Sequence, residues 1–172
     1  DHLIIEVRRE NKIYRQEYHR GDPQGEVEVV GKTDKLGTKI TFYPDKQIFD
    51  TIEFNTQTIM NRMRQQSYLT KGITISITDE RDDQRYRFYF EGGIKSYVQH
   101  LNKGKEEIGG IVYVEKEAPE GAVEVALQYN TSFQETIYTF ANNIHTIDGG
   151  MHLTGFKSAL TRTINNYARK NE

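Results

Sequence analysis

The chain has 172 residues, which suits one or two small domains rather than one large domain. Its 11 tyrosines and 8 phenylalanines argue against disorder, and the lack of cysteine favours a cytoplasmic location. The net charge of −2 excludes nucleic-acid binding through overall charge, and no apolar run approaches the ~20 residues of a membrane span. The chain starts at Asp1 rather than Met, so we expect it to be part of a longer protein.

Alternating apolar and polar residues predict antiparallel strands at the start of the chain. Residues 3–8 and 12–19 read as a hairpin across Glu10-Asn11. Residues 21–25 form a loop by composition, and two further strands are expected at 26–33 and 37–44.

A helix and a second hairpin are predicted next. Residues 55–72 have helical character, with Asn55 or Thr56 as the cap and Gly72 as the stop. Residues 73–78 and 84–91 read as a hairpin. The first ~90 residues are therefore expected to form an antiparallel sheet covered by one helix.

Gly92-Gly93 begins a new unit in the pattern. A short amphipathic helix follows, and strands are expected at 109–117, 122–130 and 135–143. The last element is a helix, because five apolar residues recur at helical spacing: Leu153, Phe156, Leu160, Ile164 and Tyr167.

Three possible metal ligands, His145, Asp148 and His152, lie within eight residues. Two histidines and one aspartate could make a three-ligand catalytic site. The stronger interpretation is structural: the helix begins here, Gly149-Gly150 permits a tight turn, and His152 packs or hydrogen-bonds at the helix start. We therefore expect no metal site.

The terminal helix has a basic outer face. Between Gly149 and Lys170 there are four basic residues and no acidic ones. With the apolar stripe inward, Arg162 and Arg169 point outward and Lys157 lies on the flank. Such a face suits contact with a nucleic-acid backbone, although an ordinary solvated helix face is the commoner case. No combination of residues in the chain indicates a catalytic set.

Several stretches together resemble a known family. They are "GTKITFYPD" (37–45), "EGGIKSYVQHLN" (91–102), "VEVALQYN" (123–130) and the long run "FANNIHTIDGGMHLTGFKSALTRTINNYA" (140–168). Their sequence and order are similar to the ATPase region of the B subunits of bacterial type II topoisomerases, over nearly the whole chain.

The resemblance implies an α+β fold in two parts. Residues 1–92 would be the C-terminal part of a GHKL-type ATPase sheet, and residues 93–172 the start of a transducer domain like the second domain of ribosomal protein S5. In this family, ATP binding closes a dimer of B subunits as a gate that captures DNA. Partners would be DNA and the A subunit in an A₂B₂ assembly, with ATP and Mg²⁺ as cofactors of the full protein.

The resemblance also assigns roles to single residues. Gly37 and Thr38 match the family's T-G-T element at the floor of the adenine pocket, with Leu36 in place of the usual first Thr. Arg9 matches an arginine at the pocket mouth, where aminocoumarin-type inhibitors bind. Lys157 matches a basic residue that lines the DNA cavity between protomers.

Arg162 and Arg169 would add to this positive lining, as inferred from the helical wheel. The family's catalytic Glu, Mg²⁺-binding Asn, adenine-binding Asp, Gly-rich lid and Gln-Thr-Lys loop have no counterpart in this sequence. The chain alone is therefore expected to be inactive. The alternatives are the B subunit of topoisomerase IV, a non-catalytic DNA- or protein-binding module, and a metalloenzyme built on the histidine cluster.

Overall fold

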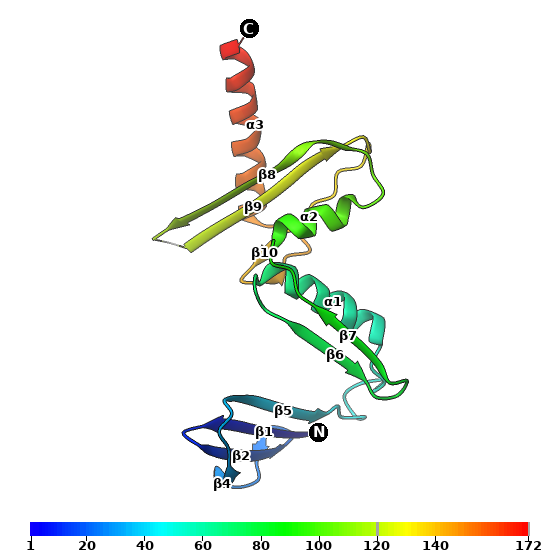
Figure 1. The fold of residues 1–172 in the computed structure, drawn as a ribbon, viewed down its shortest axis with the longest axis vertical. Coiled ribbons are helices and arrows are strands. Elements are labelled where there is room, and N and C mark those ends of the chain that lie inside the picture. The colour runs from blue at the N-terminus through cyan, green and yellow to red at the C-terminus, as the bar shows by residue number, and fades with distance from the viewer. Residues whose placement is uncertain (120, 172) are drawn as a thin grey trace. The chain divides into compact units, whose positions relative to one another are not determined.

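The structure, a computed structural model, describes residues 1–119 and 121–171. The chain divides into two compact units, with the boundary after Asn55. Helices and antiparallel strands occur together, which confirms the expected α+β class (Figure 1).

The first unit is a five-stranded antiparallel sheet. Its strands are β1 (His2–Arg9), β2 (Lys12–His19), β3 (Asp22–Pro23), β4 (Glu28–Lys32) and β5 (Gly37–Tyr43). The predicted first hairpin is present, because Glu10 and Asn11 both adopt the positive φ that a tight two-residue turn requires. The predicted loop at 21–25 contains the short edge strand β3, where Pro23 needs no ladder hydrogen bond.

The two strands that follow in sequence, β4 and β5, lie on opposite sides of the first hairpin. Strand β4 pairs with β2, and β5 pairs with β1. After β5, Pro44 ends the strand and the chain continues without regular strands to Asn55. Within this stretch the Asp45 carboxylate is buried and is held by the Arg20 guanidinium at 2.8 Å.

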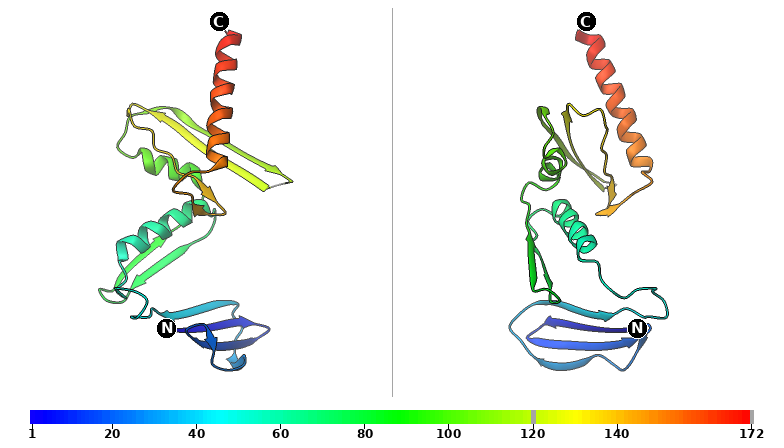
Figure 2. Two further views of the ribbon diagram at one scale, coloured as in Figure 1. Left: turned by 180° about the vertical axis from the view of Figure 1, so that it is seen from behind. Right: turned by 90° about the vertical axis from the view of Figure 1, so that its right-hand side faces the viewer.

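The second unit consists of helices and two-stranded hairpins. Its elements are α1 (Thr56–Leu69), β6 (Ile75–Asp79), β7 (Gln84–Phe88), α2 (Ile94–Asn102), β8 (Glu107–Ala118), β9 (Gly121–Asn130), β10 (Phe140–Ala141), β11 (Ile144–His145) and α3 (Met151–Asn171). Helix α1 packs on β6–β7, and α2 packs on α1 and on β8–β9 (Figure 2).

Two expectations differ from this arrangement. The expected single sheet of the first ~90 residues is two sheets, because β6–β7 pair only with each other among the described strands. The expected strand at 135–143 is reduced to β10, because Asn142 and Asn143 take positive φ and turn the chain into β11. Residues 133–139 form no strand.

Aromatic rings provide the centre of the second unit. Tyr68 is 4% exposed and is the one fully buried large hydrophobic side chain among the described residues. Its ring centroid lies 3.7 Å from that of Phe90 and 5.0 Å from that of Tyr97. Tyr97 continues the cluster to Tyr138, with centroids 5.6 Å apart. The cluster therefore joins α1, the segment after β7, α2 and the segment before β10.

The apolar stripe of helix α3 is only partly shielded from solvent. Leu153, Phe156 and Leu160 are half-buried, whereas Ile164 is 48% and Tyr167 71% exposed. No described residue of the last two turns is buried. The second half of the helix is therefore stabilised mainly by its own backbone hydrogen bonds. Arg169 and Lys170 add favourable charge at the C-terminus, which is the negative end of the helix dipole.

Candidate functional site

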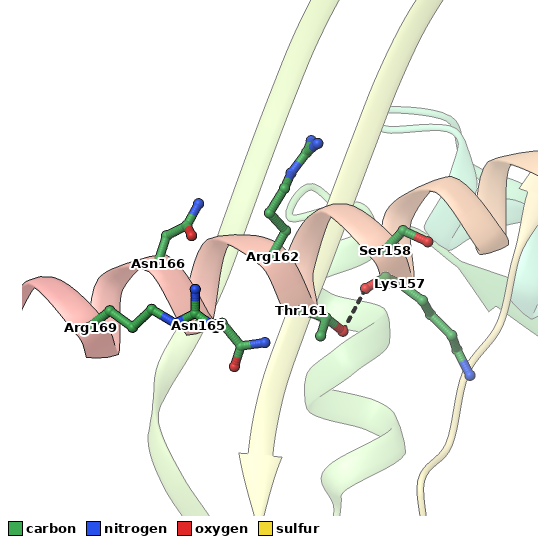
Figure 3. A pocket seen from close by; sticks show the side chains of 7 residues that line it. All are labelled: Lys157, Ser158, Thr161, Arg162, Asn165, Asn166 and Arg169. Carbon is green, nitrogen blue, oxygen red and sulfur yellow. Dashed lines mark hydrogen bonds between the residues drawn. The ribbon is translucent and has the colours of Figure 1, made fainter.

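The outer face of α3 displays the predicted basic residues. Seven side chains of this one helix border a shallow surface hollow: Lys157, Ser158, Thr161, Arg162, Asn165, Asn166 and Arg169 (Figure 3). Because every bordering residue belongs to one helix, this is an open helix face rather than an enclosed cavity. Such a face can contact an extended polyanion along the helix axis.

The three cations do not share one line along the helix. At ~100° per residue, Arg162 and Arg169 lie about 20° apart around the axis and about 10 Å apart along it. Lys157 lies about 140° around the axis from Arg162, and Figure 3 shows these two side chains leaving the helix on different sides. Arg162 and Arg169 therefore form one basic row, and Lys157 flanks it.

Lys157 is engaged in an ion pair. Its Nζ lies 2.9 Å from Oε1 of Glu135, and the two side chains are 49% and 70% exposed. An exposed pair of this kind is weak, so a phosphate can replace the carboxylate. Glu135 could not be identified from the sequence, because its partner is 22 residues away and Glu135 lies in the segment predicted as a strand.

The three residues expected at a nucleotide pocket gather at one end of the first sheet. Thr38 pairs with Val7, and Gly37 pairs with Arg8. Side chains alternate along a strand, so Arg9 lies on the same sheet face as Val7 and therefore as Thr38. The structure thus brings Thr38 and Arg9 together on one face, from two adjacent strands.

Arg9 is exposed and positioned by its neighbours. Its guanidinium carbon lies 5.6 Å from the centroid of the Tyr14 ring, and its Nε lies 3.9 Å from the Glu10 carboxylate. Gly37 has a φ of 136°, and an added Cβ would meet no atom within 4 Å. This end of the sheet is consequently open, with a hydroxyl and a guanidinium available for hydrogen bonds.

The histidine cluster has structural contacts. His145 lies on β11 with its ring centroid 5.3 Å from that of Phe140. His152 lies in the first turn of α3, where its Nε2 is 3.2 Å from Oγ1 of Thr146. Its ring covers Gly150, since a Cβ there would lie 2.9 Å from Cε1 of His152. Within residues 1–119 and 121–171, no group of three or more His, Cys, Asp or Glu side chains is placed to hold a metal.

The helices of the described residues do not meet the requirements of a membrane span. None combines the length and the apolar character that crossing a bilayer demands. Even α3, at 21 residues, is amphipathic and basic.

Comparisons with known proteins give a consistent result. The family model for DNA gyrase B matches residues 93–172. The DNA gyrase B subunit of Clostridium acetobutylicum is 49% identical over 96% of this chain and 26% of its own length. The corresponding protein of Halalkalibacterium halodurans is 47% identical over 98% of this chain and 27% of its own length.

Solved structures agree with the sequence relatives. The 43K ATPase domain of Thermus thermophilus gyrase B, crystallised with an aminocoumarin, has a TM-score of 0.84 at 34% identity, over 99% of this chain and 47% of that chain. The topoisomerase IV ATP-binding domain of Francisella tularensis, in complex with a small-molecule inhibitor, has a TM-score of 0.81 at 26% identity, over 99% and 47% of the two chains.

The chain spans about a quarter of the length of these two curated relatives. The likeness runs over nearly all of its residues, and both units contribute to the structural match. The chain therefore belongs to the DNA gyrase B family.

Proposed function

We propose that the chain is part of the ATP-operated gate of a type II DNA topoisomerase that supercoils DNA by passing one duplex through another. The observation that supports this proposal most strongly is the 49% identity to a gyrase B protein over 96% of the chain. The complete protein would act as a homodimer of B subunits with the gyrase A protein, in the cytoplasm.

The domain boundary belongs to the same proposal. Residues 1–92 would complete the GHKL ATPase sheet, and residues 93–172 would begin the transducer. The match of the gyrase B family model to residues 93–172 supports a boundary at Gly92-Gly93. These glycines lie between β7 and α2, and Gly93 has a φ of 57° that favours glycine.

On the nucleotide side, Thr38, Gly37 and Arg9 would form part of the adenine pocket of the complete protein. Thr38 can donate and accept a hydrogen bond, Gly37 leaves space beside it, and the Arg9 guanidinium can stack on a planar ligand. These residues suit an edge of the pocket but supply no carboxylate for Mg²⁺ or for activating water. ATP and Mg²⁺ would be held chiefly by other residues, so the 172-residue chain alone would neither bind ATP tightly nor hydrolyse it.

On the DNA side, Arg162 and Arg169 would contact phosphates directly, and Lys157 would do so after leaving Glu135. The open face, the basic row and the lack of acidic residues on α3 support this role. Each cation that meets a phosphate should change the slope of log affinity against log salt by about 0.9.

The experiment is a matched pair of substitutions in the full-length protein. Lys157→Ala should reduce the stimulation of ATPase activity by DNA. It should leave basal turnover unchanged, because Lys157 is distant in sequence from the proposed nucleotide residues and has no proposed role in binding the nucleotide. Glu135→Gln should instead strengthen DNA binding by about 1.5- to 5-fold, because it frees Lys157 from a weak ion pair.

Equal stimulation in Lys157→Ala and wild type would exclude the DNA-facing role of this lysine. A Glu135→Gln variant that binds DNA no better than wild type would exclude competition by the carboxylate. The B protein of topoisomerase IV is the second candidate, supported by the 0.81 TM-score to a topoisomerase IV domain. The product of the complete enzyme distinguishes the two, because gyrase introduces negative supercoils.

A further inference from the structure

The turn after α1 places a lysine against the glycine junction of the second unit. Lys71 lies between α1 and β6, and Gly93 caps the start of α2. A Cβ added to Gly93 would lie 2.7 Å from both Cγ and Cε of Lys71. The lysine methylenes therefore lie directly on Gly93, in space that only glycine leaves free.

Beyond Gly93, the Lys71 ammonium group reaches the β8–β9 hairpin. Its Nζ lies 2.8 Å from Oε1 of Glu124 and 3.6 Å from Oε2 of Glu115. It also donates a hydrogen bond of 2.7 Å to Oη of Tyr113. The Tyr113 hydroxyl lies 2.7 Å from each of the two carboxylates. We call Lys71, Tyr113, Glu115 and Glu124 the hinge clasp.

The Lys71 ammonium group lies beside two carboxylates of the hairpin. Glu115 and Glu124 are direct cross-strand partners in the β8–β9 ladder, and like charges in that position repel. The Lys71 ammonium approaches both carboxylates and offsets their repulsion. The hairpin thus carries an acidic pair whose charge is partly compensated by a residue from the other side of Gly92-Gly93.

Lys71 and Tyr113 each keep one charge state near neutral pH. Hydrogen bonds to Glu124 and Tyr113 raise the pKa of Lys71 above its ordinary value. The hydrogen bond from Lys71 lowers the pKa of Tyr113. The hydrogen bonds to Glu124 and Glu115 outweigh this effect and raise the pKa to about 12. The lysine is therefore charged and the tyrosine neutral under ordinary conditions.

We propose that Lys71 is a positioning residue that fixes the β8–β9 hairpin to the end of α1 across the Gly92-Gly93 junction, and so couples the nucleotide-side segment to the DNA-side segment. The coupling role rests on the proposed function; the mechanical role rests on the contacts alone. If the clasp opens, the hairpin loses this attachment to the turn after α1, whereas its contacts with α2 remain.

Lys95 provides a matched control. Its Nζ lies 4.1 Å from the centroid of the Tyr113 ring, closer than the 5.0 Å of Lys71. Lys95 belongs to α2, however, and therefore lies on the same side of Gly93 as the hairpin. Substituting it removes a cation from the same ring without removing a link across the junction.

The test uses the full-length protein with Lys71→Met, Lys71→Arg, Lys95→Met and the double substitution Lys71→Met/Glu124→Gln. Hydrogen exchange of the β8–β9 amides should quicken about 5-fold in Lys71→Met, the factor for one well-placed charge pair. Lys71→Arg should restore slow exchange. The double variant should exchange more slowly than Lys71→Met, because neutralising Glu124 relieves the exposed carboxylate repulsion.

The functional readout separates the two parts of the proposal. In Lys71→Met, stimulation of ATPase by DNA should fall while basal turnover stays unchanged, and Lys95→Met should keep both. Equal exchange in Lys71→Met and Lys95→Met would overturn the clasp. Faster exchange with normal stimulation would overturn its coupling role alone. A wild-type protein without DNA-stimulated ATPase would instead contradict the proposed function, and the exchange data would still decide on the clasp.

Discussion

Replacing Tyr68 by alanine should destabilise the second unit more than any exposed aromatic substitution. Tyr68 is 4% exposed, and its ring stacks on Phe90 and Tyr97 with centroids 3.7 and 5.0 Å away. A buried aromatic side chain covers about 150–250 Å². At about 25 cal/mol per Å², its removal accounts for about 4–6 kcal/mol as an upper bound, of which large-to-small substitutions typically realise about 3–5 kcal/mol.

The magnitude matters because little else in the unit is fully buried. A unit of this size commonly has a free energy of unfolding of about 5–15 kcal/mol. Loss of about 3 kcal/mol should therefore lower the urea midpoint clearly, as followed by far-ultraviolet circular dichroism. Tyr68→Phe keeps the ring stack and should cost less than about 1.5 kcal/mol.

The matched control is Tyr167→Ala on α3. Tyr167 is 71% exposed, so its removal should change the free energy of unfolding by less than about 0.5 kcal/mol. If Tyr68→Ala and Tyr167→Ala lower the free energy of unfolding equally, the aromatic cluster is not the centre of this unit and the reasoning fails.

Two further predictions concern acid stability and nucleotide binding. Hydrogen bonds, first from Arg81 and then from Thr56, hold the pKa of Asp79 well below its ordinary value. The ionised carboxylate therefore stabilises the fold above about pH 4. This stabilisation disappears as the pH falls toward the depressed pKa. The start of α1 should therefore lose protection against amide exchange, corrected for the intrinsic effect of pH, as the pH falls below about 4. An Asp79→Asn variant that showed the same pH dependence would refute the assignment. Calorimetric titration of the 172-residue chain with ATP and Mg²⁺ should give no measurable heat of binding, whereas micromolar affinity would contradict the proposed division of the pocket.

Local chemistry explains which elements could be predicted from the sequence. The first hairpin followed from alternation on both sides of Glu10-Asn11, and α3 followed from apolar residues at helical spacing. The pairing of β5 with β1, and of β4 with β2, could not be predicted, because alternation identifies strands without identifying their neighbours. Residues 135–143 illustrate this point. Their apolar residues predict a strand, but a strand requires a partner, and within this segment only β10 pairs with another strand.

The candidate site shows the same distinction. Lys157, Arg162 and Arg169 could be placed on α3 from helical geometry alone, and Thr38 and Arg9 came from family resemblance. The ion pair with Glu135 and the hinge clasp could not be predicted, since their partners are far apart in sequence. In the sequence, Lys71 falls at the end of the predicted helix 55–72, and only the folded chain brings it to Gly93 and Glu124.

The most direct test of the proposed function is the product formed from relaxed closed-circular DNA. The full-length protein, combined with a gyrase A protein and supplied with ATP and Mg²⁺, should introduce negative supercoils, and omission of ATP should abolish them. ATP-dependent relaxation and decatenation without supercoiling would contradict the assignment in favour of topoisomerase IV. The absence of any ATP-dependent change in linking number would contradict the proposal that this chain belongs to a DNA gate.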